Sequence, residues 1–346
     1  LMYLLAQPVS RAEVFFGNYH DVGMATMPNM GKASSARIVR DFMKWFKLKI
    51  SKDKPWTEIV SDMIDARGTD EGDPALAWKL SFYGGEGFAI EFANGAAQQL
   101  LGIRLVCARC HDHPFDGWTV ENYYGLASFI TRQKARGYGK GGEMDTVDHV
   151  EIKYADDGEM MMPTIEGSGK KNVDLANGGV AKPSFLDGKT AGKMDDRMKL
   201  LAAFMTSKSN TQLSRALANR VWGWLFGRGI VHPVDDFNKI NKALSPAVLD
   251  SLVRSLQDNK YSLKYLVRAI CNTETYQRSC ESDAPYPKIN FSRGTVKQLN
   301  GEQLLNSIHV ATQGRPLKNT GQVMEMVGSL YPSGAGRVSS KTVPWG

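Results

Sequence analysis

The residues that constrain this chain most are Cys107-Ala-Arg-Cys110-His111-Asp-His113-Pro, where thiols and imidazoles crowd together. Two thiols three positions apart, followed at once by a histidine, form the attachment sequence of a c-type haem. In this hypothesis Cys107 and Cys110 form thioether bonds and His111 binds the iron. Such a site needs an element that delivers the three residues in a fixed orientation beside an apolar wall.

Other chemistry is open to the same residues. Cys107 and Cys110 could pair as a local disulfide, act as a redox dithiol, or share a zinc ion with His111 and His113. Four zinc ligands within seven residues would be cramped, and the remaining two cysteines do not form a second pair at zinc-finger spacing. A thioredoxin-like dithiol opens a helix after a strand, whereas here a helical pattern runs into the motif. Covalent haem is the preferred hypothesis, and the disulfide and zinc clips remain alternatives.

The sequence around the motif resembles a known family. Residues 101–116, with 123–129, are similar to the planctomycete cytochrome-c-like domain of unknown function, which is common in exported proteins of planctomycetes and verrucomicrobia. Its usual companion, the planctomycete-specific C-terminal domain, is resembled by segments 215–222, 225–231, 233–237 and 261–268. The resemblance implies an exported protein of the periplasm or cell surface. It also favours a site role for His113, because the family motif has a histidine here.

The chain is predicted to be mainly α, in three parts. A helical cytochrome-c-like domain covers 1–135, a Gly-rich connector with a small β insert covers 136–193, and a helical C-terminal domain covers 194–346. Apolar periodicity predicts helices near 35–48, 55–64, 75–83, 88–106, 119–130, 197–205, 213–226, 246–257 and 263–272. Residues 149–154 alternate like a strand, and 159–165 is the predicted partner across a turn.

The other axial position of a bound iron needs a donor. His149 and Met161 are the first candidates, with His20 and the neighbouring methionines at 160 and 162 as alternatives. Methionine there would raise the reduction potential relative to a second histidine, and a vacant position would favour small-molecule chemistry. We rank His149 first, because a strand next to the motif domain could present it rigidly.

Two aspartates follow the motif. Asp112 or Asp116 could accept a hydrogen bond from an imidazole, such as that of His113, and fix its tautomer. A polar turn held by local aspartate hydrogen bonds explains the same residues equally well.

The predicted helix over 213–226 is almost apolar all round, so Arg220 within it is expected to be buried. A buried guanidinium needs a carboxylate, and Asp235 or Asp236 is the predicted partner in a structural ion pair. Cys271 is expected to be an ordinary buried thiol, with a disulfide to Cys280 as the alternative.

The formal net charge of +7 and the pI near 9.1 favour acidic partners. An acidic redox protein and an anionic polysaccharide are both compatible with this charge. No basic block interleaved with aromatic residues points to nucleic acid, and no apolar run is long enough to span a bilayer. The first hypothesis is therefore an exported protein with one haem c, acting in electron transfer or as a redox subunit of an assembly. The alternative is a non-catalytic structural or interaction protein of the cell surface.

Overall fold

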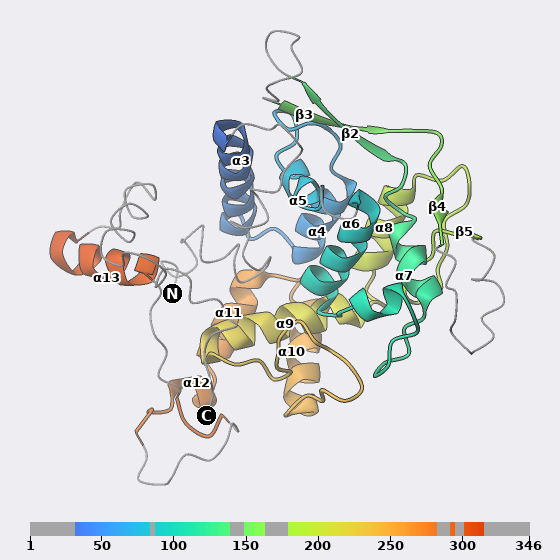
Figure 1. The fold of residues 1–346 in the computed structure, drawn as a ribbon. Coiled ribbons are helices and arrows are strands. Elements are labelled where there is room, and N and C mark those ends of the chain that lie inside the picture. The colour runs from blue at the N-terminus through green and yellow to red at the C-terminus, as the bar shows by residue number, and fades with distance from the viewer. Residues whose placement is uncertain are drawn as a thin grey trace. The chain divides into compact units, whose positions relative to one another are not determined.

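The structure is a computed structural model (Figure 1). Amphipathic helices form most of its N-terminal half. They are α3 (Lys32–Ser51), α4 (Trp56–Asp65), α5 (Leu76–Leu80) and α6 (Phe88–Ala96). Pro55 is the N-cap of α4, because its fixed φ suits a helix start, and α4 buries the predicted apolar face. The predicted helices in these four regions are confirmed.

The helix that leads into the motif is shorter than predicted. After α6 the chain widens into a π-helical turn, η2 (Ala97–Leu101), and then stops at Gly102. Gly102 has a φ of +66°, a left-handed conformation that glycine adopts without steric cost and that ends helices. The motif itself begins in a separate 3₁₀ turn, η3 (Val106–Arg109), and the next helix is α7 (Val120–Ala127).

In the part of the chain that the structure describes, two small antiparallel sheets lie among the helices. The first pairs β1 (Gly68–Thr69), β3 (His149–Tyr154) and β2 (Gln133–Tyr138) in that order. The second pairs β4 (Met160–Met161) with β5 (Val180–Ala181). The strand over 149–154 is confirmed, but its predicted partner is wrong. Residues 133–138 pair with it instead, and 160–161 pair with a strand about twenty residues further on.

The C-terminal helices follow the predicted pattern closely. They are α8 (Arg197–Thr206), α9 (Thr211–Phe226), α10 (Pro246–Asp258), α11 (Leu263–Cys271) and the short α12 (Glu274–Gln277). Gly227, with a φ of +79°, ends α9 where a glycine C-cap was expected. A further helix, α13 (Gly301–Gln313), lies in a separate unit.

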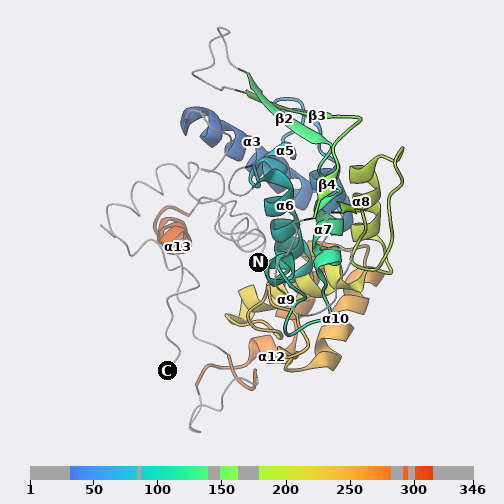
Figure 2. The same ribbon diagram turned by 45° about the vertical axis from the view of Figure 1, so that its right-hand side comes forward.

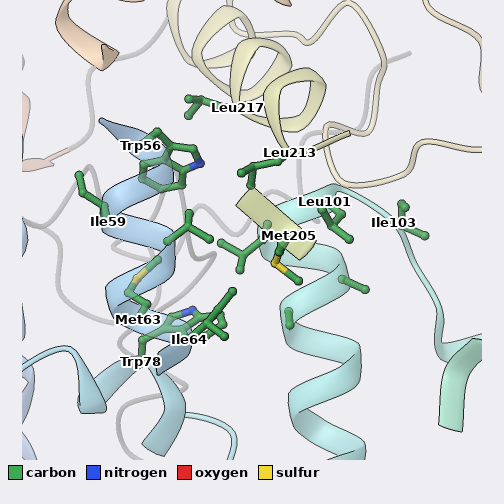
Figure 3. Close-up of a cluster of buried hydrophobic side chains, with 14 of the residues drawn as sticks. Trp56, Ile59, Met63, Ile64, Trp78, Leu101, Ile103, Met205, Leu213 and Leu217 are labelled. Carbon is green, nitrogen blue, oxygen red and sulfur yellow. The ribbon is translucent and has the colours of Figure 1, made fainter. Parts of the chain in front are cut away.

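Apolar side chains from both halves of the chain share one core. Figure 3 shows Met63 and Trp56 of α4 beside Met205 of α8 and Leu213 of α9, with Leu101 of η2 against the same cluster. Each of these side chains is at most 3% exposed. The helices on either side of the small sheets are therefore packed together rather than held apart by an insert.

The structure describes residues 32–83, 87–138, 149–162, 179–281, 291–294 and 301–314. His20 lies outside these ranges. The chain divides into two units, 1–294 and 295–346, so the unit boundary differs from the predicted ends at 135 and 193. Strand β2 crosses the predicted boundary at 135, because it pairs with β3 on the other side. The mainly α prediction is confirmed, and none of the described helices has the length and apolarity needed to cross a bilayer.

Candidate haem-attachment site

The two motif cysteines lie on one side of a tight turn. Cys107 is inside the 3₁₀ turn η3 and Cys110 caps its end, with φ −110° and ψ −24°. Side chains three apart are aligned along a 3₁₀ helix, so both thiols lie on the same side, and both are exposed. Ala108 between them is fully buried and holds the turn against the protein. The turn therefore presents two thiols together to the solvent.

The imidazole of His111 is held in one tautomer. Its Nδ1 lies 2.8 Å from the backbone oxygen of Asp112. A carbonyl oxygen only accepts, so Nδ1 carries the proton and the lone pair is on Nε2. Metal-binding histidines are typically oriented in this way, with one nitrogen donating to a carbonyl and the other free to bind. His111 is exposed and directly follows Cys110 in the chain, so its Nε2 is open to the solvent.

The residues after His111, from Asp112 to Trp118, form a hydrogen-bonded turn. The Asp112 carboxylate accepts from the backbone N–H of Val120, and Asp116 accepts from Gly117. His113 accepts from the N–H of Phe115 through Nδ1 and donates its own backbone N–H to Trp118. Neither aspartate side chain bonds an imidazole in the described residues. The local-turn interpretation of Asp112 and Asp116 agrees with these contacts, and Asp112 orients His111 through its carbonyl rather than its carboxylate.

Helix α7 anchors the other end of this turn. Thr119 and Asn122 form a reciprocal capping box at its N-terminus, which fixes where the chain leaves the loop. Tyr124 on α7 is buried, which raises its pKa, while a hydrogen bond from Arg109 of η3 acts in the opposite direction. The motif turn is thus attached to α7 at Arg109 and again at Val120.

The segment before the motif is tied to the loop between α9 and α10, residues 227–245. Asp235 in that loop accepts from Arg104 at 2.8 Å and from Gln98 at 2.5 Å. The backbone N–H of Phe237 donates to the oxygen of Gly102 at 2.8 Å. Burial alone would raise the pKa of Asp235, but the hydrogen bonds from Arg104 and Gln98 hold it below its ordinary value.

Arg220 has a different partner from the one predicted. It is buried in α9 as expected, but its guanidinium donates to the backbone oxygen of Gln98 at 2.5 Å. Asp235 interacts with it only through its charge and is hydrogen-bonded to Arg104, and Asp236 lies 4.0 Å from Arg104. Burial lowers the pKa of Arg220 to about 10, so it stays cationic at neutral pH. Arg104, an exposed residue of the segment before the motif, reaches the Asp235 carboxylate and forms the ion pair in place of Arg220.

The structure does not bring His149 to the motif. His149 opens β3, 3.6 Å from Asp70 and 3.5 Å from Glu71 through Nδ1. Its strand lies toward the opposite end of the first unit from the segment between α6 and α7, as both views show (Figures 1 and 2). Its Nδ1 also lies 3.1 Å from the guanidinium of Arg37, which donates to it, so this side chain belongs to a polar cluster on the sheet.

Met161 is also distant from the motif. It lies in β4 and is 58% exposed. Its partner strand β5 is held by Ser128 at the C-terminal end of α7, whereas the motif turn is held at the N-terminal end. Eight residues of helix, about 12 Å, separate the two ends. Met161 and the motif therefore lie at opposite ends of α7.

None of the four cysteines, all of which lie in the described ranges, forms a disulfide. Cys271 is buried and hydrogen-bonds Tyr276, which agrees with the expected buried thiol, and Cys280 is exposed. Within the described ranges, no three His, Cys, Asp or Glu side chains come together as a metal site.

Two buried charged groups escaped the sequence analysis. Arg197 is 2% exposed and makes a bidentate bond to Glu159, which also accepts from the buried Arg132. Lys79 is fully buried, and burial lowers its pKa to about 7. Glu159 lies in a predicted strand, and Lys79 in a predicted helix, and neither pattern indicates a buried charge. Only the tertiary contacts reveal them.

The fold and the loop define a mainly helical protein with an exposed Cys-x-x-Cys-His turn. Residues 4–135 match the family model PSCyt2, a protein of unknown function (DUF1549), and 196–333 match PSD1, a protein of unknown function (DUF1553). The two matches occur in the order that the resemblance implied, with the cytochrome-like segment first and the C-terminal segment second. No curated protein and no solved structure matches the chain.

Proposed function

We propose that this protein is a c-type cytochrome-like redox protein that holds one haem through Cys107, Cys110 and His111. The observation that carries the proposal is the geometry of the turn. Two exposed thiols lie on one side of η3, and the next residue is an exposed histidine whose Nδ1 is bonded to a backbone carbonyl, which leaves Nε2 for a ligand bond. This donor set fits the group, since two thioether bonds and one imidazole ligand are what a c-type haem requires.

The surroundings of the turn support the same proposal. The indole N–H of Trp118 is buried with no acceptor among the described residues, so the loop retains an unused donor. Val106 and Phe115 on either side of the cysteines are 54% and 58% exposed. Large apolar side chains left in water on an ordered loop are typical of a binding surface.

The haem, when bound, supplies one-electron exchange between ferric and ferrous iron. The residues of this chain fix the attachment points, orient the imidazole through the carbonyl of Asp112, and keep the site at the surface. A partner can approach an exposed loop of this kind without opening the core. The proposed activity is therefore electron transfer, alone or as the redox subunit of an assembly.

The proposed location is outside the cytoplasm, in the periplasm or at the cell surface, where haem c is attached. The net charge of +7 supports an acidic redox partner. An anionic polysaccharide also carries the complementary charge and is the other candidate partner.

The test is expression of the full chain together with a c-type haem attachment system in an oxidising compartment. We expect a red protein with a Soret band that keeps its haem through acid-acetone extraction and denaturing electrophoresis. The double variant Cys107→Ala/Cys110→Ala should lose the adduct completely. The matched control Cys271→Ala/Cys280→Ala removes the other two thiols and should keep it.

A colourless wild-type protein with no haem adduct in its mass would overturn the proposal. The same cysteines would then serve the alternative function, a surface interaction protein with a disulfide or metal clip. Mass spectrometry after thiol alkylation would show the disulfide as two unmodified cysteines.

A further inference from the structure

The loop 227–245 belongs to the PSD1 segment, yet it contacts the PSCyt2 segment just before the motif, at Gly102 and Arg104, and just after it, at Gly117. Figures 1 and 2 both show the chain before α7 beside α9 and α10. The contact is specific, since the backbone of Phe237 bonds Gly102, and a Cβ added at Gly102 would lie 2.9 Å from the Phe237 ring. The ion pair between Arg104 and Asp235 fixes the same contact.

The contact continues along the motif turn. A Cβ added at Gly117 would lie 3.3 Å from Nζ of Lys239, so this ammonium reaches the last residues of the turn. No carboxylate within the described ranges forms an ion pair with Lys239. An unneutralised cation therefore lies beside the turn that carries the two thiols.

The residue after this lysine is apolar and exposed. Ile240 is 68% exposed and Leu244, in the same loop, is 50% exposed. The loop is nevertheless ordered, because Asn238 accepts from the N–H groups of Ile240 and Asn241, and Leu244 donates to the oxygen of Ile230. A hydrogen-bonded loop that holds an isoleucine in water presents that side chain to something that the described residues do not supply.

We propose that the loop 227–245 of the PSD1 segment is one wall of the haem site, with Ile240 as an apolar contact and Lys239 as the cation for a carboxylate of the porphyrin. The inference rests on the proposed function. The occupant is chosen because Lys239 reaches Gly117 at the end of the thiol turn and because the exposed groups next to it combine a cation, Lys239, with an apolar side chain, Ile240. A haem has the same two features, an apolar macrocycle and two carboxylates.

The arrangement assigns a role to the second family segment. The thiols and His111 come from one segment, and the wall comes from the other, so neither alone would contain the whole site. Asp235 and Phe237 are positioning residues here, because they act by holding the loop against the motif.

Lysine acetylation of the intact folded chain tests the cation directly. The haem-loaded wild type and the haem-free Cys107→Ala/Cys110→Ala variant are acetylated in parallel, and each lysine is quantified by mass spectrometry. Lys239 should react at least about fivefold more slowly in the loaded protein. Lys242, an exposed lysine of the same loop, is the internal control and should react equally in both. Equal reactivity of Lys239 in the two forms overturns the inference.

The apolar contact has its own readout. In the loaded protein, Ile240→Ser should shift the Soret band and lower the midpoint potential, because a wetter site favours the ferric state. The control Leu48→Ser, at an exposed position on α3, should leave both unchanged. A loaded Ile240→Ser variant with the wild-type spectrum and potential contradicts the wall. Absence of haem from the wild type is the separate result that removes the proposed function and this inference with it.

Discussion

The motif turn and the cluster of Arg197, Arg132 and Glu159, which we call the junction, are both polar, but their polar groups have opposite environments. At the junction, Arg197 and Arg132 are almost fully buried and bond the same carboxylate, Glu159. In the turn, Cys107, Cys110 and His111 are exposed, and their reactive atoms bond no other described side chain. The junction uses its charges to hold the fold together. The turn leaves its chemical groups open, as expected of a site.

The largest loss of stability is expected when Glu159 is neutralised. Glu159→Gln leaves two buried guanidinium groups without a countercharge and should lower the free energy of unfolding by about 2.5 kcal/mol at pH 7, less than for a fully buried pair because the Glu159 side chain is 39% exposed. Its hydrogen bonds to Arg197 hold the pKa of Glu159 below 4.5, so this stability is present above pH 4.5 and is lost as the pH falls through the lowered value. Urea unfolding measures it, with Glu151→Gln as the control. A loss no larger than in the control would contradict the structural role of the junction.

Lys79 is a buried charge whose removal should raise, rather than lower, the free energy of unfolding. Its pKa falls from 10.5 to about 7 on folding, so the unfolded chain binds the extra proton and stability declines as the pH falls from 10.5 to 7. Lys79→Met should raise the free energy of unfolding by about 2 kcal/mol at pH 7 and flatten this dependence. Thermal unfolding at several pH values measures the effect, and the exposed Lys199→Met serves as control. An unchanged pH profile would show that Lys79 is hydrated.

A smaller effect is expected where the motif turn joins α7. Thr119→Ala removes the N-cap hydrogen bond from Asn122 and should cost about 1 kcal/mol. Hydrogen exchange should show faster opening of the first turn of α7, while the exchange of α10 stays at the wild-type rate. Equal acceleration in both helices would mean that the cap stabilises the whole unit rather than this end of the loop.

The smallest effect is expected inside the turn itself. Asp116 is bonded to the N–H of the next residue and to no distant group among those described. Asp116→Ala should therefore change the free energy of unfolding by less than about 0.5 kcal/mol. Denaturant unfolding of the haem-free chain measures this. A loss close to that of Glu159→Gln would erase the distinction between the two regions.

Local signals in the sequence predicted most of the helices. Pro55 marked the start of α4 and Gly227 the end of α9, because both residues act through their own backbone angles. The 149–154 strand was visible from its alternation. The exposed thiols and His111 were found from spacing alone, as the chemistry of the motif is also local.

Features that depend on distant contacts were missed or misassigned. Gly102 ends the helix before the motif where Phe237 packs against it, and that packing partner is over a hundred residues away. The pairing of β3 with β2 and the bonding of Asp235 to Arg104 depend on the same kind of contact. Charge patterns predict that a buried arginine needs a partner, but they do not determine which group is nearest.

The hydrogen bond from Phe237 to Gly102 limits how far the N-terminal segment can fold while the chain is being synthesised. Gln212 also reaches back, donating to the oxygen of Leu101, so the stretch before the thiols is completed by residues synthesised long after it. A polypeptide halted near residue 200 would leave these carbonyls and the apolar side of η2 uncovered. Separate expression of the two matched segments should therefore give poorly folded pieces, and mixing them should restore structure only if they associate.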